Sequence, residues 1–259
     1  MATFRNIWKG GYYEGDPLNP MSDSGYGVAG YNSVLYTIYQ ACIRPYITEQ
    51  TVVIEIGPGR GAWTKAILSR NPRAIYAFDA APPSHTGFWE YVGRDPRIKY
   101  ITAEDFSLDG VPGESANFFF SFGTFCHLKP EYSREYISSL FAKMAPQANG
   151  FLMVGDFDKY NTLAADVDRV SLDKILRGRR IFALAWAGYS VARMFLPSRF
   201  CFQPVDKGQA LNLTGGTTAS WYHFGKNEAC QHIKEVGFEV IDSDISVSPR
   251  DPIIHFRKP

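Results

Sequence analysis

The chain has 259 residues, with 27 Lys and Arg against 26 Asp and Glu and a formal net charge of +1. This balance argues against nucleic-acid binding, and the length suits one α/β domain with additions. No stretch is apolar and long enough to span a membrane, and no signal peptide is evident, so we expect a cytoplasmic protein without a membrane partner. The four scattered cysteines form no C-x-x-C pair, which predicts reduced thiols rather than a zinc site or disulfides.

Residues 1–30 are rich in Gly, Asp and Pro, but they also contain the aromatic residues Tyr12, Tyr13 and Tyr26. Aromatic side chains are not typical of disordered segments. A glycine-hinged aromatic segment predicts either a lid that binds the substrate or an arm packed on the surface, and we weigh the two equally. Residues 31–47 show helical periodicity, which Pro45 ends or kinks.

The stretch TVVIEIGPGRGAWTKAIL, residues 51–68, organises the rest of the chain. Its first part, residues 52–56, is a short β-branched run that predicts a buried strand. The turn that follows contains Gly57, Pro58, Gly59 and Gly61, and residues 62–68 have the pattern of a helix. Strand, glycine turn and helix form half of a nucleotide-binding βαβ unit.

Two interpretations of this turn are open. Gly57, Gly59 and Ala62 satisfy the G-x-G-x-x-G/A pattern of dinucleotide-binding proteins. However, Glu55 precedes the first glycine by two residues, and Gly61 extends the pattern to E-x-G-x-G-x-G. This pattern resembles the first motif of class I S-adenosylmethionine (SAM) methyltransferases. The resemblance implies that the acid supports the turn and faces the methionine amino group of SAM, while the glycine backbone packs against the cofactor.

Further acids follow the next two predicted strands. Asp79 and Ala80 end the apolar run of residues 74–78, and a carboxylate there can accept both ribose hydroxyls of NAD or of SAM. Residues 98–102 form the third strand. The resemblance implies that an acid after it binds the adenine amino group and that its neighbour stacks on the ring. The candidates are Glu104, Asp105 and Phe106, and a solvated loop acid is an equal alternative for either carboxylate.

Residues 115–122 are the most apolar strand and are expected at the centre of the sheet. Gly123 follows, and the loop faces the methyl group if the resemblance holds. His127 is the first candidate for a general base, because a neutral imidazole accepts a proton near working pH. The alternative is that His127 only shapes the pocket. Asn117 stands where the family usually has Asp.

The next elements are a helix over residues 130–144, a turn over 146–150 and a fifth strand over 150–158. Asp156 lies in this last segment and is predicted to orient a base or hold the acceptor. A metal bound by Asp156 and Asp158 is the least favoured option, so we expect no metal site.

Residues 161–216 are an insertion before the last two strands. Such insertions often cap the acceptor site in the family, and its six arginines either bind phosphate or carboxylate groups or lie in solvent. Trp221, Tyr222 and His223 follow, the first two as candidate acceptor-binding residues and the third as a second candidate base. A helix over 226–236 and strands over 238–242 and 252–257 complete the chain.

The sequence thus predicts an α/β fold with a seven-stranded, mostly parallel, Rossmann-like methyltransferase sheet and helices on both faces. We expect O-methylation of a small polar acceptor such as a sugar or a phosphorylated metabolite, with S-adenosylhomocysteine as product and with a homodimer as an option. The alternatives are an N-methyltransferase, an NAD-dependent oxidoreductase and a non-catalytic SAM-binding protein. The expected parts are a lid and cover helix (1–48), a SAM-binding core (49–160), a cap (161–216) and the end of the core (217–259).

Overall fold

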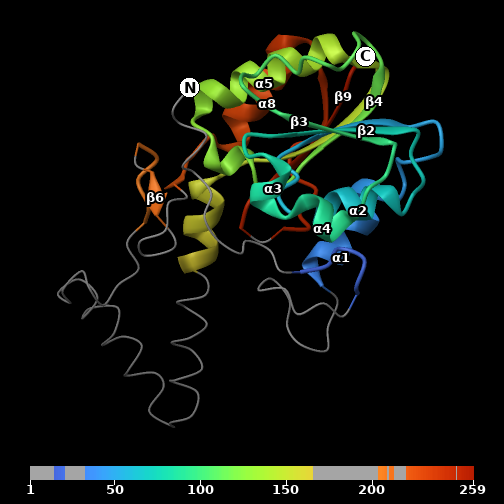
Figure 1. Cartoon of the computed structure of the whole chain (residues 1–259). Helices are drawn as coiled ribbons and strands as arrows, with labels where there is room; N and C mark the ends of the chain where they lie inside the picture. The colour runs from blue at the N-terminus through green and yellow to red at the C-terminus, as the bar shows by residue number, and fades with distance from the viewer. Residues whose placement is uncertain (1–14, 21–32, 166–203, 209, 213–219, 249) are drawn as a thin grey trace, which may run out of the picture.

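A twisted sheet between two layers of helices forms the body of the computed structural model (Figure 1). The structure describes residues 15–20, 33–165, 204–208, 210–212, 220–248 and 250–259. Seven strands form the main sheet in the order β3-β2-β1-β4-β5-β9-β8. Their bounds are β1 Val52–Ile56, β2 Ala74–Asp79, β3 Ile98–Thr102, β4 Ala116–Ser121, β5 Met144–Met153, β8 Glu239–Asp242 and β9 Ile253–Arg257.

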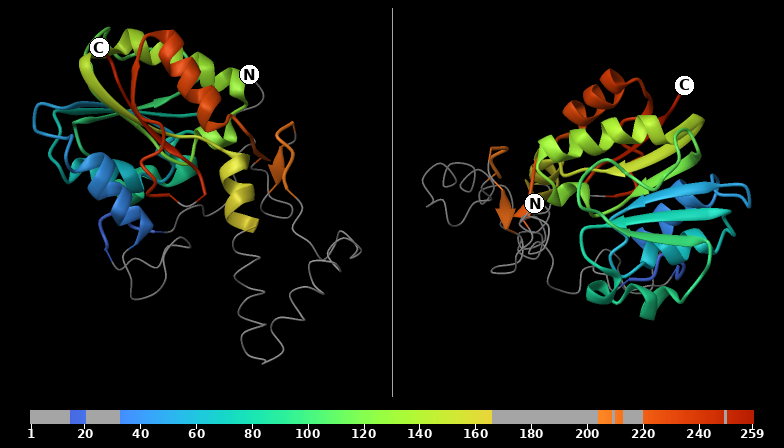
Figure 2. Two further views of the ribbon diagram at one scale, coloured as in Figure 1. Left: turned by 180° about the vertical axis from the view of Figure 1, so that it is seen from behind. Right: turned by 45° about the horizontal axis from the view of Figure 1, so that its top comes forward.

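Helices cover both faces of this sheet (Figures 1 and 2). On one face lie α5 and α8, which pack against each other. The other face carries α1, the π-helix η1, α2 and α4. The helical bounds are α1 Val34–Ile38, η1 Tyr39–Ile43, α2 Ala62–Leu68, α3 Pro83–Thr86, α4 Phe88–Val92, the 3₁₀-helix η2 Phe125–His127, α5 Pro130–Lys143 and α8 Lys226–Val236.

The central strand β4 builds both halves of the core. Phe119 packs in the cluster beneath α5 and α8, while Phe118 and Phe120 pack in the cluster beneath α1 and α2. This alternation follows from the two-residue period of a strand. All three side chains are at most 1% exposed, so each contributes about 1.5–3 kcal/mol of burial free energy.

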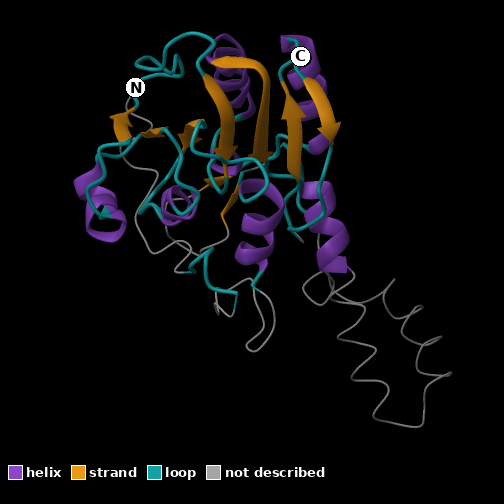
Figure 3. Ribbon diagram, turned by 90° about the vertical axis from the view of Figure 1, so that its right-hand side faces the viewer, coloured by secondary structure: helices purple, strands orange, loops and turns teal. Residues whose placement is uncertain are grey.

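Strand β9 is the antiparallel member of the sheet. It pairs with β5 on one side and with β8 on the other, whereas β1, β2, β3, β4 and β5 pair in parallel (Figure 3). The carboxyl ends of the parallel strands therefore share one edge with the start of β9. The chain proceeds from β1 outward to β2 and β3, and then returns to β4. The switch point between β1 and β4 is where open α/β sheets bind ligands.

The predicted turn over 146–150 and the fifth strand over 150–158 were wrong in their limits. Strand β5 begins at Met144 and ends at Met153. The turn-forming residues produce a bulge inside the strand, where pairing with β4 shifts between Ala116 and Phe118. Gln147 adopts a φ of 64° there, and its N–H donates to the carbonyl of Lys258. A backbone partner outside the segment therefore turned a predicted boundary into a bulge.

The first helical segment also differs from the sequence prediction. The helix expected over 31–47 is a short α-helix continued by the π-helix, and both end before Pro45. Gly87, whose φ is 66°, separates the short helices α3 and α4. Residues 157–165 are helical, and β6 (Leu211–Asn212) pairs with β7 (Ser220–Trp221) in a small second sheet. Within the described residues, no helix is long and apolar enough to cross a membrane.

Candidate functional site

The three glycines after β1 have different surroundings. All have positive φ angles, 73° at Gly57, 55° at Gly59 and 96° at Gly61. A Cβ at Gly57 would collide with Thr124, and one at Gly61 would collide with Val92. A Cβ at Gly59 would meet no atom within 4 Å. The outer glycines therefore pack against the protein itself, whereas the middle one borders open space that a ligand can enter.

Glu55 is the buried acid of the site. It is 2% exposed, and the Thr64 hydroxyl donates to its Oε2 at 2.7 Å. Burial raises the pKa of Glu55 to about 8, which the charge of Asp79 reinforces and the bond from Thr64 opposes. The carboxyl therefore holds a proton near neutral pH. A cation that docks against it, such as an ammonium group, would favour its ionised form.

Asp79 ends β2 and joins this strand to the glycine turn. The Gly59 N–H donates to its Oδ2 at 3.0 Å, and the Ala81 N–H donates to its Oδ1 at 2.9 Å. Burial raises the pKa of Asp79, while these bonds and one from the Ala80 N–H oppose that shift. Pro58 is buried and fixes the turn, because its carbonyl accepts from the Gly61 N–H at 2.8 Å. Backbone donors thus hold the predicted ribose acid against the glycine turn.

The candidates after β3 lie nearer to solvent. Glu104 and Asp105 are both exposed. Hydrogen bonds from the Ser107 hydroxyl and N–H lower the pKa of Asp105, which favours its ionised form. Phe106 is half-buried and stacks on Tyr132, with 5.1 Å between the ring centroids. Their contacts with adenine stay a prediction.

His127 lies in η2, four residues beyond Gly123, on the loop that follows β4. Its side chain is 8% exposed, and its Nδ1 lies 3.0 Å from the carbonyl oxygen of Ser220. A carbonyl can only accept, so Nδ1 carries the proton and Nε2 carries the lone pair. Burial is the largest cause that lowers the pKa of His127. The ring is therefore neutral at pH 7, with its basic atom at Nε2.

The second candidate base, His223, has the opposite tautomer. The Phe157 N–H donates to His223 Nδ1 at 3.0 Å, so this nitrogen must hold the lone pair. The proton of the neutral ring then lies on Nε2. Burial is the largest cause that lowers the pKa of His223 as well. His223 is thus a hydrogen-bond donor at Nε2, and its basic nitrogen is occupied by the start of the helix over residues 157–165.

Asp156 connects two helices. Its Oδ1 accepts from the N–H groups of Asp158 and Lys159 at 2.9 and 3.0 Å, at the start of the helix over 157–165. Its Oδ2 accepts from the Lys226 N–H at 2.8 Å, at the start of α8. Both carboxylate oxygens thus satisfy backbone donors at helix N-termini, which gives Asp156 a structural role. Its predicted catalytic role has no support from this geometry.

The segment from Trp221 to His223 crosses the carboxyl edge of the sheet. The Tyr222 N–H donates to the carbonyl of Cys126 at 2.8 Å, which ties the segment to the loop after β4. Trp221 is fully buried and contacts the rings of Phe157 and Tyr160. Tyr222 is only half-buried. Both residues lie close to the predicted acceptor side, and their substrate contacts stay a prediction.

The described part of the N-terminal region contacts the glycine turn. The Arg60 guanidinium donates to the carbonyl of Gly15 at 3.1 Å, and it also lies over the Tyr91 ring, 4.6 Å from the centroid. Residues 15–20 therefore pack beside the predicted cofactor site. The predicted substrate-binding residues Tyr12, Tyr13 and Tyr26 lie outside the described residues, as does most of the insertion.

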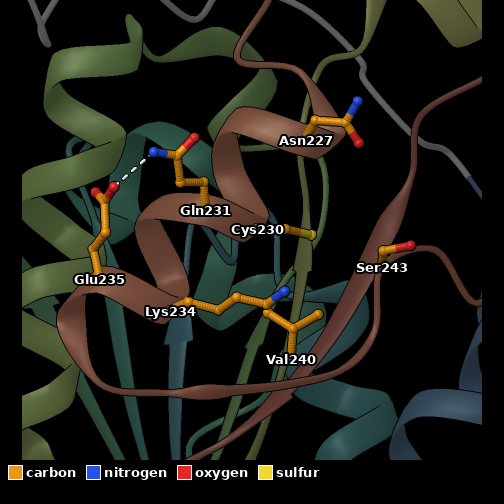
Figure 4. A pocket seen from close by; sticks show the side chains of 7 residues that line it. All are labelled: Asn227, Cys230, Gln231, Lys234, Glu235, Val240 and Ser243. Carbon is orange, nitrogen blue, oxygen red and sulfur yellow. Dashed lines mark hydrogen bonds between the residues drawn. The ribbon is translucent and has the colours of Figure 1, made fainter.

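A depression between α8 and β8 lies away from this site (Figure 4). It is at the edge strand, four strands from β1. Its lining is mixed in polarity and comprises Asn227, Cys230, Gln231, Lys234, Glu235, Val240 and Ser243. Chemistry at the glycine turn does not involve this surface.

The sequence analysis missed several groups that shape the site. Thr64 holds Glu55, and the Ser220 carbonyl fixes the tautomer of His127. Arg250 and Asp251, just before β9, form an ion pair at the carboxyl edge of the sheet. Ser220 lies 93 residues from His127, so no local pattern connects them. The antiparallel direction of the last strand is the one signal that places residues 250 and 251 at this edge.

Comparison with known proteins supports the fold. No family model matches the chain. A SAM-dependent methyltransferase from Mesorhizobium loti aligns with a TM-score of 0.57 and 11% identity, covering 87% of this chain and 98% of the other. A Listeria monocytogenes protein assigned to the same class aligns with a TM-score of 0.56 and 11% identity, covering 86% and 97%. Identities this low establish the fold alone.

One curated protein shares a short stretch of sequence. Ribosomal RNA small subunit methyltransferase A from Sulfurihydrogenibium sp. (strain YO3AOP1) is 33% identical over 63 residues, which is 24% of each chain. The chain thus spans about a quarter of the length of this relative. The chain has the Rossmann-like fold of class I SAM-dependent methyltransferases. This follows from the order of its strands, the antiparallel direction of β9 and the similarity to these solved structures.

Proposed function

We propose that this protein is a SAM-dependent methyltransferase that methylates an oxygen atom of a small polar acceptor. The observation that carries the proposal is the arrangement at the switch point between β1 and β4. There the buried Glu55, the open side of Gly59 and the backbone-held Asp79 meet. His127 follows on the loop after β4, the strand beside β1.

The residues around the turn fit the cofactor. Open space beside Gly59 admits a ligand next to the backbone, and the buried acid Glu55 suits the methionine ammonium group. Asp79 offers two carboxylate oxygens to the ribose hydroxyls. Phe106 and Asp105 would bind on the adenine side. When bound, SAM supplies a methyl group on a positively charged sulfur.

His127 is the better of the two candidate bases. The hydrogen bond to Ser220 leaves the lone pair of His127 on Nε2, a buried atom, so Nε2 would take the proton of an acceptor hydroxyl only after neighbouring side chains move. His223 has its lone pair engaged by a backbone N–H, which removes it from this role. Alignment of the two substrates would supply much of the remaining rate enhancement.

Other functions receive less support. The dinucleotide-binding fold has strand order 3-2-1-4-5-6, whereas here an antiparallel strand lies between β5 and β8, which disfavours an NAD-dependent oxidoreductase. The curated relative acts on RNA, but a net charge of +1 does not favour a nucleic-acid partner.

N-methylation needs the same donor site and would differ in the acceptor. A cytoplasmic location and a homodimer are further parts of the proposal.

Calorimetric titration with S-adenosylhomocysteine, with NADH as the comparison ligand, tests the donor site. We expect binding of S-adenosylhomocysteine and its loss in Asp79→Ala. The matched control is Asp109→Ala, because the Asp109 side chain is 88% exposed. Preference for NADH, or unchanged affinity in Asp79→Ala, would refute the assignment. A non-catalytic protein would bind S-adenosylhomocysteine but transfer no label from methyl-labelled SAM to any hydroxylated acceptor in a screen.

A further inference from the structure

The carboxyl group of Glu55 lies in surroundings that solvate a negative charge poorly. In the sheet, Glu55 of β1 is in register with Ala77 of β2 on one side and with Phe120 of β4 on the other. Both neighbours are apolar and at most 1% exposed. The Thr64 hydroxyl, from α2, is the one hydrogen-bond donor to Glu55 among the described residues. Apolar neighbours and a single neutral donor favour the uncharged acid.

The titratable groups around Glu55 also favour its uncharged form. Asp79, at the end of the adjacent strand β2, acts on Glu55 through its negative charge. Tyr100 of β3 is close enough to respond to both carboxyl groups, but its hydroxyl donates to the carbonyl of Ala81. His85 in α3 acts on Asp79. Among the residues that the structure describes, none adds a positive charge that acts on Glu55.

The two carboxyl groups of the site differ in their hydrogen bonds. Asp79 accepts from the backbone N–H groups of Gly59 and Ala81, one on each oxygen, and these bonds favour a carboxylate. Glu55 accepts only from the Thr64 hydroxyl. Two nearby carboxyl groups resist ionising together, because each negative charge disfavours the other. Glu55 is therefore the member of the pair that is better suited to hold a proton while the site is empty.

We propose that Glu55 is protonated in the empty protein and releases its proton to solvent when the ammonium group of the cofactor docks against it, so that cofactor binding depends on pH. This inference rests on the proposed function, which supplies the identity of the cofactor. In the step, the O–H bond of the Glu55 carboxyl breaks and the buffer takes the proton. The resulting carboxylate accepts a hydrogen bond from the ammonium group, which keeps its three hydrogens. The incoming positive charge replaces the proton as the partner of the buried acid.

Calorimetric titration with S-adenosylhomocysteine counts the released protons when buffers of different ionisation enthalpy are compared at one pH. Because the pKa of Glu55 is raised to about 8, the wild-type protein should release about 0.9 protons per ligand at pH 7 and about 0.5 at pH 8. The association constant should rise about ten-fold from pH 6 to pH 7. The matched control is Glu49→Gln, which removes an exposed carboxylate before the amino end of β1 and should behave like wild type.

Two variants assign the proton to Glu55. Glu55→Gln cannot ionise, so it should bind S-adenosylhomocysteine more weakly and without proton release. Thr64→Val keeps a branched side chain but removes the hydrogen bond that lowers the pKa of Glu55. The pKa of Glu55 should then rise further, and proton release at pH 8 should increase toward one proton per ligand. Thr64→Val also serves if Glu55→Gln does not fold or does not bind the ligand.

The results separate this inference from the proposed function. Binding of S-adenosylhomocysteine to the wild-type protein without proton release would overturn the inference alone. Absence of binding at every pH would reject the proposed function together with it. Proton release that persists in Glu55→Gln would assign the proton to another group, and release at pH 8 that is unchanged in Thr64→Val would show that Glu55 is not the titrating residue. Either of these two results would also overturn the inference.

Discussion

Gly57 and Gly59 are two residues apart, yet their replacement by alanine should have different consequences. Both have positive φ angles, which cost an alanine about 1–2 kcal/mol. Alanine also lowers the conformational entropy of the unfolded chain, which offsets about 0.4–1 kcal/mol of this cost. At Gly59 no steric cost is added, because a Cβ there meets no atom within 4 Å. Gly59→Ala should therefore lower the free energy of unfolding by only about 1 kcal/mol.

Gly57→Ala carries a second cost. The new Cβ would overlap Thr124, which is itself bonded to the carbonyl of Ile56. Overpacking of this kind costs about 1–3 kcal/mol, so the total loss should reach about 2–4 kcal/mol. The larger specific effect on ligand affinity should instead occur at Gly59. Gly59→Ala should lose most of its affinity for S-adenosylhomocysteine while it remains folded, because its methyl group occupies the open space of the site.

Urea denaturation and calorimetric titration measure these two quantities. Gly87→Ala is the matched control, since Gly87 is left-handed with a φ of 66° and its nearest contact, at 3.4 Å, is an ordinary one with Glu90. It should lose about as much stability as Gly59→Ala and bind the ligand normally. If Gly59→Ala binds S-adenosylhomocysteine like wild type, the ligand does not approach this turn. If it unfolds as easily as Gly57→Ala, the steric argument is wrong.

Two further predictions concern buried carboxyl groups. The folded-state pKa of Glu55, about 8, lies above its ordinary value of 4.5, so the folded protein binds more protons and should lose stability as pH rises from about 5 to about 8. In urea denaturation, Glu55→Gln should reduce the slope of the free energy of unfolding against pH. The pKa values of Asp79 and Asp251 are also raised, so an unchanged slope would assign the pH dependence to these two residues. Asp156→Ala should destabilise the protein by about 2–4 kcal/mol, because two helices lose their N-terminal caps. The control Asp158→Ala removes an exposed carboxylate and should cost less than about 1 kcal/mol. Equal losses of stability in the two variants would contradict the capping role of Asp156.

The sequence predicted elements whose signals are local. Strand β1, helix α2 and the end of β2 at Asp79 all lie where the apolar runs and glycines placed them. Helix α8 also ends as predicted, because Gly237 adopts the left-handed conformation that terminates a helix. Asn117, which departs from the family pattern, accepts from the Val52 N–H at the amino end of β1. That departure is therefore at the opposite end of the sheet from the site.

The histidine roles depended on contacts that no local pattern contains. The sequence made His127 the first candidate because it follows the fourth strand and His223 the second because it follows the insertion, yet each tautomer is determined by a distant backbone group. A carbonyl from Ser220 and an N–H from Phe157 produce opposite proton positions on two rings whose pKa values are both lowered by burial. Asp156 was predicted from its place near the end of β5, but its oxygens face two helix starts. Such pairings arise only when the loops pack together.

The direction of the last strand explains why the acceptor side was the hardest part to predict. In a fully parallel sheet, residues just before a strand lie at the edge where all strands begin, which is the edge opposite the ligand. Because β9 is antiparallel to β5, residues 250 and 251 instead enter the carboxyl edge, beside the loops that carry His127 and Trp221. The donor site is thus built from consecutive motifs in one half of the chain. The acceptor side requires segments from β4, β7 and β9, so its chemistry becomes visible only when the sheet order is known.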